Sequence, residues 1–228
     1  MNIEQLNWDS HFFGIKIGKV RLDNPTFAEL NLIKDKASKN AYLLLYLIAD
    51  EAIEVPSFAS LVDIKKTYQR TTSLILLNAP IAVYNADSPS PALIALALAS
   101  GSHSRFKIDT HFPTGSFERL YKEWIVKSVN KQIADYTFVY SMEATIAGFV
   151  TLKLEGSHGS IGLLAVDEVY RGRGIGSALV HYVLNFLHEN NINSCTVATQ
   201  AHNSEACRLY ERCGFEIESS QYYYHLWL

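Results

Sequence analysis

Apolar residues follow the alternating period of a β-strand in some segments of the chain and the longer period of an amphipathic helix in others. Ile15–Leu22 alternates and predicts a strand. Thr26–Asn40 predicts a helix, because Thr26 and Glu29 are spaced as a capping box ahead of an apolar stripe. Tyr42–Ala49 is a continuous apolar run, which is typical of a strand buried on both faces. This first part of the chain therefore predicts a small α/β unit.

The pattern continues beyond a less regular stretch. Glu51–Leu61 shows no clear period, and Val62–Leu77 predicts one or two extended segments. After Asn78-Ala79-Pro80, which punctuates the chain, the same periods predict further elements. The strands are Ile81–Tyr84, Tyr136–Tyr140, Ile146–Leu154, Ser160–Val166, Ser194–Thr199 and Phe215–Trp227; the helices follow Ser90 and lie over Ser116–Gln132, from Gly174, and over Ser204–Cys213.

A glycine-rich turn joins the strand Ser160–Val166 to the helix that starts at Gly174, and it reads Tyr-Arg-Gly-Arg-Gly-Ile-Gly over residues 170–176. Glycines let a backbone approach an anion closely, and the first N–H groups of a helix have no internal partner. The turn therefore predicts a pyrophosphate site. A turn kept only for tight packing is the alternative, and the NAD-type spacing G-x-G-x-x-G is not met.

Composition removes several classes of protein. The chain has 228 residues, a net charge of −3 and no basic cluster, so a nucleic-acid partner is not expected. The three cysteines fit neither a disulfide framework nor a zinc site, so no metal is predicted. The N-terminus lacks a signal-peptide pattern, and the longest apolar run, Ala92–Ala99, is too short to cross a membrane. We expect a cytoplasmic protein with no membrane partner.

The segment LLAVDEVYRGRGIGSALV resembles motif A of the GNAT acetyltransferase superfamily, whose turn reads Arg/Gln-x-x-Gly-x-Gly/Ala, with Arg171, Gly174 and Gly176 at the defining positions. The resemblance implies the GNAT fold, an α/β (α+β) arrangement with a mixed, mostly antiparallel sheet flanked by helices. It implies acetyl-CoA as co-substrate. The implied contacts to its pyrophosphate come from Arg171, Gly172, Arg173, Gly174, Ile175, Gly176 and Ser177, and those to pantetheine from Leu164, Ala165 and Val166 on a bulged, splayed strand.

Two more residues follow from the same resemblance. Asn203 stands where the family has an asparagine that touches the pantetheine arm, and it is also a natural cap for the helix that follows. Tyr210 stands where the family has a tyrosine that meets the sulfur of coenzyme A. Its phenol holds its proton at neutral pH and can donate it to a leaving thiolate, so Tyr210 is the predicted general acid. The alternative for Tyr210 is a packed core aromatic.

A longer resemblance concerns the acceptor. LNWDSHFFG, HSRF, FERLYKEWI and GLLAV…VATQ…N…RLY…ES…YY look like the dTDP-fucosamine acetyltransferase family, which acetylates dTDP-4-amino-4,6-dideoxygalactose for surface polysaccharide assembly. This implies a small α/β domain over residues 1–78 that contributes to the acceptor pocket, and a GNAT domain over 79–228. We assign Ser104, Arg105, Phe106 and Tyr223 to that pocket; the Arg105 guanidinium could meet the acceptor's phosphates or form a surface salt bridge.

The sequence leaves three questions open. The general base has four candidates, Asp63, His103, Glu155 and His158, each of which could equally be a structural group. A GNAT protein could also acetylate a protein N-terminus, a lysine or another small amine, or bind acetyl-CoA without catalysis as a sensor. Exposed edge strands in such folds often pair, so a homodimer is also consistent with the pattern.

Overall fold

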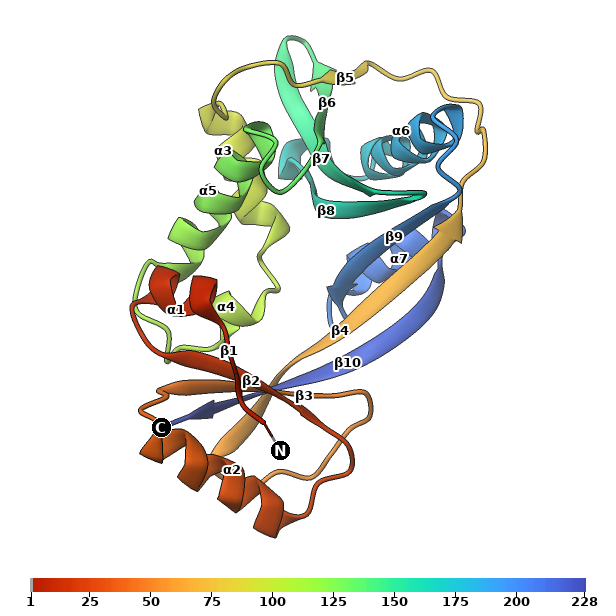
Figure 1. Ribbon diagram of the computed structural model, residues 1–228. Coiled ribbons are helices and arrows are strands. Elements are labelled where there is room, and N and C mark those ends of the chain that lie inside the picture. Colours follow the sequence, from red (N-terminus) through yellow and green to blue (C-terminus); the bar gives the residue numbers. More distant parts are fainter. Residues whose placement is uncertain (1) are drawn as a thin grey trace.

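The computed structural model describes residues 2–228, whose strands form a single sheet in the order β1-β2-β3-β10-β4-β9-β8-β7-β6-β5 (Figure 1). The neighbours β2–β3 and β8–β9 are parallel, and the other neighbouring pairs are antiparallel. The strands are β1 (Glu4–Gln5), β2 (Ile17–Leu22), β3 (Leu44–Ala49), β4 (Ala59–Thr71), β5 (Ile81–Val83), β6 (Tyr136–Met142), β7 (Thr145–Glu155), β8 (His158–Val166), β9 (Ser194–Gln200) and β10 (Glu216–Trp227).

The helices flank this sheet, which confirms the predicted architecture. They are α1 (Asn7–Phe13), α2 (Phe27–Lys39), α3 (Pro91–Ser100), α4 (Arg105–Ile108), α5 (Ser116–Val129), α6 (Ile175–Glu189) and α7 (Ser204–Arg212). The capping box at Thr26 and Glu29 forms as the sequence predicts. The helices α1 and α4 were not predicted, because an element of one or two turns holds too few residues to show a period.

The last strand ties the two ends of the chain together. β10 lies between β3 and β4 and is antiparallel to both, so the C-terminal strand completes the sheet started by the first 71 residues (Figure 1). Its register with β4 shifts between Tyr223 and Tyr224. The division of the chain at residue 78 stays a prediction; one continuous sheet runs through both of the proposed parts.

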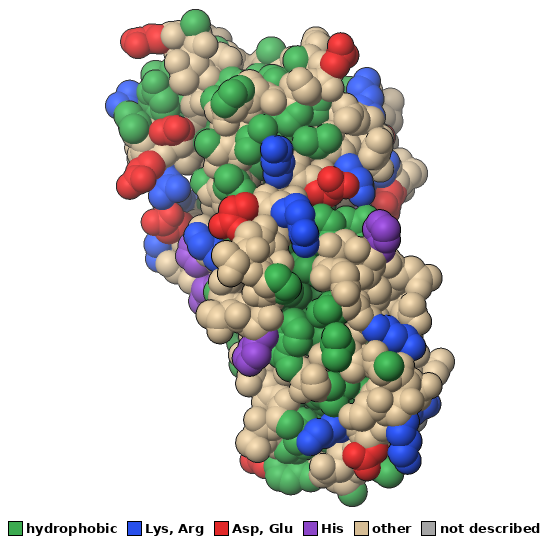
Figure 2. Space-filling view, turned by 90° about the vertical axis from the view of Figure 1, so that its left-hand side faces the viewer, with side chains coloured by type: hydrophobic (Ala, Val, Ile, Leu, Met, Phe, Trp, Pro, Cys, Tyr) green, Lys and Arg blue, Asp and Glu red, His purple; other side chains and the backbone are tan. Residues whose placement is uncertain are grey.

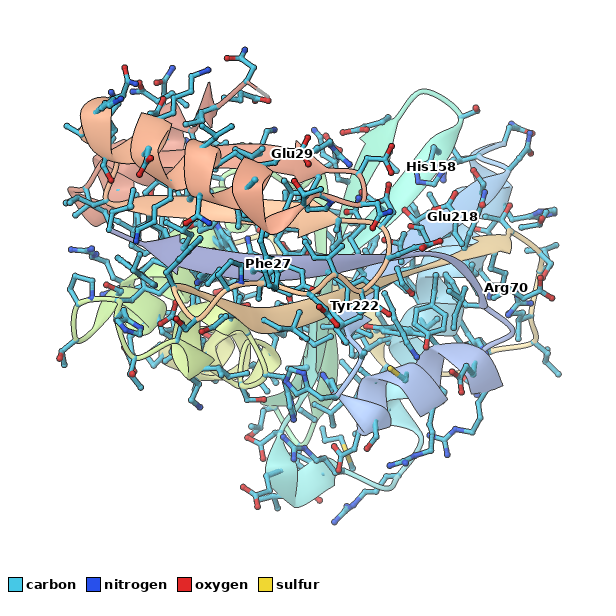
Figure 3. The ribbon with its side chains drawn as sticks, turned by 90° about the horizontal axis from the view of Figure 1, so that it is seen from below. Phe27, Glu29, Arg70, His158, Glu218 and Tyr222 are labelled. Carbon is cyan, nitrogen blue, oxygen red and sulfur yellow. The ribbon has the colours of Figure 1, made fainter. Side chains whose placement is uncertain are left out.

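Around β10 the sheet is covered on both faces. Helix α2 packs on one face against a cluster that includes Leu45, Leu47 and Leu226. Residues that alternate with these point to the other face, where Tyr46 joins Phe106 and other aromatic side chains from the helical side. Figure 3 shows α2, with Phe27 and Glu29 labelled, on one side of the strands and the green helices on the other.

The second half of the sheet is sandwiched in the same way. Phe138 and Val150 face α6 and α7, whereas the adjacent residues Val139 and Phe149 face α3 and α5. Charged side chains of both signs gather near the middle of the side that carries α1, α3 and α5 (Figure 2). No helix in residues 2–228 combines the length and apolar character that a membrane crossing needs. The homodimer stays a prediction.

Candidate active site

The glycine-rich turn presents a set of unpaired amides. It follows a short 3-10 turn, Glu168–Tyr170, and leads into α6, whose N-cap Gly174 supplies no side chain. Gly172 and Gly174 adopt φ angles of 75° and 78°, a left-handed conformation that favours glycine. No N–H group from residue 172 to 177 donates to an acceptor in the described part of the chain. These amides, at the positive end of a helix, fit a phosphate group.

A cavity of about 700 Å³ opens in front of these amides. A Cβ atom added at Gly172 or Gly174 would meet no atom within 4 Å, so the backbone there faces open space. Gly176 differs, because its added Cβ would lie 3.3 Å from a Leu209 methyl of α7; this glycine lets two helices pack closely. Among the residues assigned to coenzyme A, those that line the cavity are Leu164, Ala165, Val166, Arg171, Gly172, Gly174, Ile175, Gly176, Ser177 and Asn203.

The structure places Arg173 elsewhere and adds residues that the motif did not reveal. Arg173 does not line the cavity, and its guanidinium lies 5.5 Å from the centre of the Tyr170 ring. His103 lines the cavity beyond the end of α3, and Arg208 and Arg212 line it from α7. Arg208 and Arg212 are four residues apart on one helical face, a spacing that could have identified them as further cationic residues near the predicted pyrophosphate site.

The strand β8 separates from its neighbour at this cavity. β8 pairs with β9 only over His158–Ile161, although both strands continue beyond that point. Opposite Thr151, β8 carries two residues, Gly162 and Leu163, where the partner strand has one, so the strand bulges. The Leu163 amide is bonded to the Thr151 hydroxyl at 2.8 Å. The bulge and the divergence leave the β9 side of Leu164–Val166 without a strand partner.

A second cavity, of about 500 Å³, adjoins the first. The two share Ser100, Leu164, Asn203 and Ala206 as lining residues. Its other walls come from α1, β4, α4, α5 and β9, which lie far apart in the sequence. The aromatic and charged lining residues are Trp8, Asp9, Asp63, Lys65, Arg105, Phe106, Tyr121 and Trp124.

Asp63 is the most buried carboxylate in this second cavity. It is 4% exposed; its Oδ2 lies 3.9 Å from an Arg105 nitrogen, and its Oδ1 has no hydrogen-bond partner in the described structure. Burial raises the pKa of Asp63, and the Arg105 guanidinium opposes that rise. Burial also raises the pKa of Asp9. The cavity therefore holds two carboxylates that keep a proton more readily than an aspartate in water does.

The acceptor residues predicted from the sequence gather around Arg105. Ser104 and Phe106 line the cavity with it, and the Ser104 hydroxyl caps α4 by accepting from the Phe106 amide at 3.3 Å. Tyr223 does not line the cavity; its ring centre lies 4.6 Å from the Arg105 guanidinium and supports it from the sheet. The Tyr46 ring lies beneath the same guanidinium at 5.2 Å.

Tyr210 reaches the second cavity from α7. Asn203 caps this helix by accepting from the Ala206 amide at 3.2 Å. At the other end, the Arg70 guanidinium donates to the Cys213 carbonyl, and Figure 3 marks Arg70 at this side of the molecule. The Tyr210 ring packs 5.9 Å from that of Tyr68, and its hydroxyl makes no hydrogen bond within residues 2–228. Burial raises the pKa of Tyr210, so its phenol stays protonated.

The structure separates the four candidate bases. Asp63 lines the second cavity, and His103 lines the first, where burial lowers its pKa. Glu155 and His158 face each other at the β7–β8 hairpin, outside both cavities. Both ring nitrogens of His158 are bonded, to the hydroxyls of Ser194 and Thr196 at 2.8 Å each. His158 is therefore a structural residue that joins β8 to β9.

Comparison with known proteins agrees with this geometry. Residues 103–215 match the Acetyltransferase (GNAT) family. The chain therefore carries a GNAT acetyltransferase domain and is an N-acetyltransferase that uses acetyl-CoA. It is 28% identical over 231 residues to the dTDP-fucosamine acetyltransferase of Escherichia coli O6:H1, covering 97% of this chain and 96% of that protein. It is 29% identical over 136 residues to the spore coat polysaccharide biosynthesis protein SpsD of Bacillus subtilis, covering 60% of this chain and 47% of SpsD.

Solved structures share the fold at lower identity. A GCN5-related N-acetyltransferase from Sphaerobacter thermophilus is 15% identical, with a TM-score of 0.56 over 98% of this chain and 75% of its own. A conserved protein from Staphylococcus epidermidis is 16% identical, with a TM-score of 0.61 over 93% of this chain and 84% of its own. These likenesses confirm the predicted GNAT fold.

Proposed function

We propose that the protein transfers the acetyl group of acetyl-CoA to the primary amine of a nucleotide-linked amino sugar of the dTDP-4-amino-4,6-dideoxyhexose type, for surface polysaccharide synthesis. The observation that carries the proposal is the second cavity, where a buried carboxylate with a free oxygen adjoins the coenzyme cavity. The similarity to the dTDP-fucosamine acetyltransferase over nearly the whole chain supports the same acceptor class.

In this proposal the two cavities divide the substrates. The amides of residues 172–177 bind the pyrophosphate of acetyl-CoA, and the open edge of β8 at Leu164, Ala165 and Val166 pairs with its pantetheine arm. Asn203 lines both cavities and contacts the same arm near the thioester. The first 78 residues contribute the wall formed by Trp8, Asp9, Asp63 and Lys65 to the acceptor cavity.

The chemistry requires two proton transfers. The acceptor amine must be neutral to attack the acetyl carbonyl, and Asp63 takes the proton that the nitrogen loses as the new C–N bond forms. The C–S bond then breaks, and Tyr210 gives its proton to the leaving thiolate. Both residues line the same cavity, so one bound acceptor can lie between them. Juxtaposing the two substrates supplies a large part of the rate by removing the entropy of encounter.

Unpartnered polar atoms in this region support a polar acceptor. Within residues 2–228, six buried side-chain N or O atoms lack a hydrogen-bond partner. Two of them, Asp63 Oδ1 and Arg105 Nε, belong to residues that line the second cavity. A buried polar atom without a partner is costly, so these two atoms are suited to the hydroxyl and amino groups of a sugar.

The test is release of free CoA by the purified protein with dTDP-4-amino-4,6-dideoxygalactose, with peptides bearing a free N-terminus or lysine, and without acceptor. We expect CoA release with the amino sugar and not with the peptides or without acceptor, and we expect mass spectrometry to detect the acetylated sugar. Turnover of peptides with none of the sugar would assign a protein acceptor. Binding of acetyl-CoA without turnover of either would favour a sensor.

A further inference from the structure

The acceptor cavity contains a cation that forms no ion pair. Lys65 lines the cavity from β4, is partly buried, and makes no ion pair within residues 2–228. The other cation in the wall, Arg105, is already engaged, because it faces Asp63 at 3.9 Å and lies against three aromatic rings. Lys65 is therefore the cation in this wall that is free to bind an anionic ligand.

A second cation, Arg21, lies on the same face of the sheet, three strands away from β4. Arg21 on β2 pairs in register with Ile48, which pairs with Tyr223, which pairs with Asp63, so these four residues form a row on one face. Arg21 is exposed and forms no ion pair with the described residues. Burial lowers the pKa of Lys65, and the charges of Arg105 and Arg21 lower it further, against the opposing effect of Asp63. A bound anion would relieve that repulsion.

We propose that Lys65, assisted by Arg21, binds the diphosphate of the nucleotide-linked acceptor and so selects diphosphate-linked over free amino sugars. This rests on the proposed function. Asp63 and Lys65 line the same cavity from one strand. They are two residues apart, so the rise of a strand separates their Cα atoms by about 7 Å. A single pyranose ring spans a distance of that order. With the amine at Asp63, the phosphate on the opposite side of the sugar ring reaches the Lys65 ammonium.

The matched control is the adjacent lysine. Lys66 follows Lys65 on β4, points to the opposite face of the strand and does not line the cavity. Lys65→Gln removes the charge at similar side-chain length, and Lys65→Arg keeps it. Lys66→Gln removes a charge of the same sign from the same strand. Thermal unfolding of each variant identifies any that is not folded.

Two measurements test the proposal. The first is the KM for the dTDP-linked amino sugar and for acetyl-CoA. The second is binding of dTDP alone by calorimetry, which does not depend on turnover. We expect Lys65→Gln to raise the acceptor KM and the Kd of dTDP by about 10- to 100-fold, with an unchanged KM for acetyl-CoA. Lys65→Arg should restore most of the affinity, Arg21→Gln should cause a smaller loss, and Lys66→Gln should match the wild type.

The outcomes separate this proposal from the function on which it rests. If the amino sugar is acetylated and Lys65→Gln leaves both the acceptor KM and the Kd of dTDP unchanged, the diphosphate assignment is wrong and the acetyltransferase assignment stands. If the sugar is not acetylated but dTDP binds and Lys65→Gln weakens it, the anion site stands and the acceptor is wrong. Equal losses in Lys65→Gln and Lys66→Gln would also overturn the assignment, since a general charge effect would explain them.

Discussion

Replacing Tyr210 by phenylalanine removes one hydroxyl from the boundary of the acceptor cavity and leaves the ring in place. The ring packs against Tyr68 and Phe215, with centres 5.9 and 6.0 Å away, and these contacts survive the change. The hydroxyl has no hydrogen-bond partner within residues 2–228, so its loss leaves no protein group unsatisfied. We therefore expect the free energy of unfolding to change by less than about 0.5 kcal/mol.

The effect on rate should be far larger. A positioned general acid contributes about 10²- to 10⁴-fold, which corresponds to roughly 3–5 kcal/mol of the activation barrier. Tyr210→Phe should lower kcat by a factor in that range while the KM for acetyl-CoA stays close to that of the wild type. Because burial raises the pKa of Tyr210, its loss should not remove an alkaline limb from the pH–rate profile near neutrality.

Tyr68→Phe is the matched control, since it removes a neighbouring phenol that has a different role. The Tyr68 hydroxyl donates to Glu211 at 3.0 Å and does not line either cavity. Its loss should cost about 1 kcal/mol, a fall in Tm of about 2–4 °C, with kcat unchanged. Steady-state kinetics and thermal unfolding of both variants give the comparison. A Tyr210→Phe enzyme with wild-type kcat would refute the assignment of Tyr210 as the acid.

Three further predictions concern the turn, the base and the core. Gly174→Ala places a Cβ at φ 78°, which should lower the free energy of unfolding by about 1–2 kcal/mol and raise the Kd of acetyl-CoA measured by calorimetry. The control is Gly156→Ala, at φ 60° in the β7–β8 turn outside both cavities, which should lower the free energy of unfolding by a similar amount and leave acetyl-CoA binding unchanged. Asp63→Asn should lower kcat/KM about 10²- to 10⁴-fold and abolish the acid limb of the pH–rate profile. Because the pKa of Asp63 is raised, that limb should lie above the range of an ordinary aspartate. A variant whose profile keeps the same limb would exclude Asp63 as the base. Burial works to raise the pKa of Asp109, but hydrogen bonds from three neighbours, including the His225 ring at 2.5 Å, lower the pKa overall. The ionised carboxylate therefore stabilises the fold at neutral pH, and this stabilisation is lost as the pH falls through the folded-state pKa. Asp109→Asn should lower the free energy of unfolding by about 1–3 kcal/mol at pH 7, and chemical denaturation at several pH values should show that difference shrinking in acid.

The predicted coenzyme-binding part of the site could be recognised from the sequence because consecutive residues form it. The strand β8, the turn and the start of α6 are consecutive, and the φ angles of Gly172 and Gly174 follow from glycine chemistry within that segment. The direction of single side chains was less accessible. Arg173 belongs to the motif, yet it turns to the Tyr170 ring instead of the cavity, because a side chain on a turn is oriented by its neighbours in space.

The acceptor side could not be read in this way. Its walls come from segments that include Trp8, Asp63, Arg105 and Tyr210, and only the packing of helices α1, α4 and α7 on the sheet places them around one cavity. The sequence offered four bases of equal standing, and the structure separated them by location. Tyr223 was predicted to touch the acceptor, whereas β10 places it beneath Arg105, one layer further from the cavity.

By itself, then, the amino-acid sequence determined the class of chemistry: contiguous residues form the phosphate-binding turn, and local backbone preferences are enough to build it. Tertiary structure alone decided what the acceptor meets. The insertion of β10 between β3 and β4 aligns Arg21, Tyr223 and Asp63 in one row, and burial of Asp63 raises the pKa of its carboxyl. The spacing of residues along the chain predicts neither the register between distant strands nor the desolvation that follows from it.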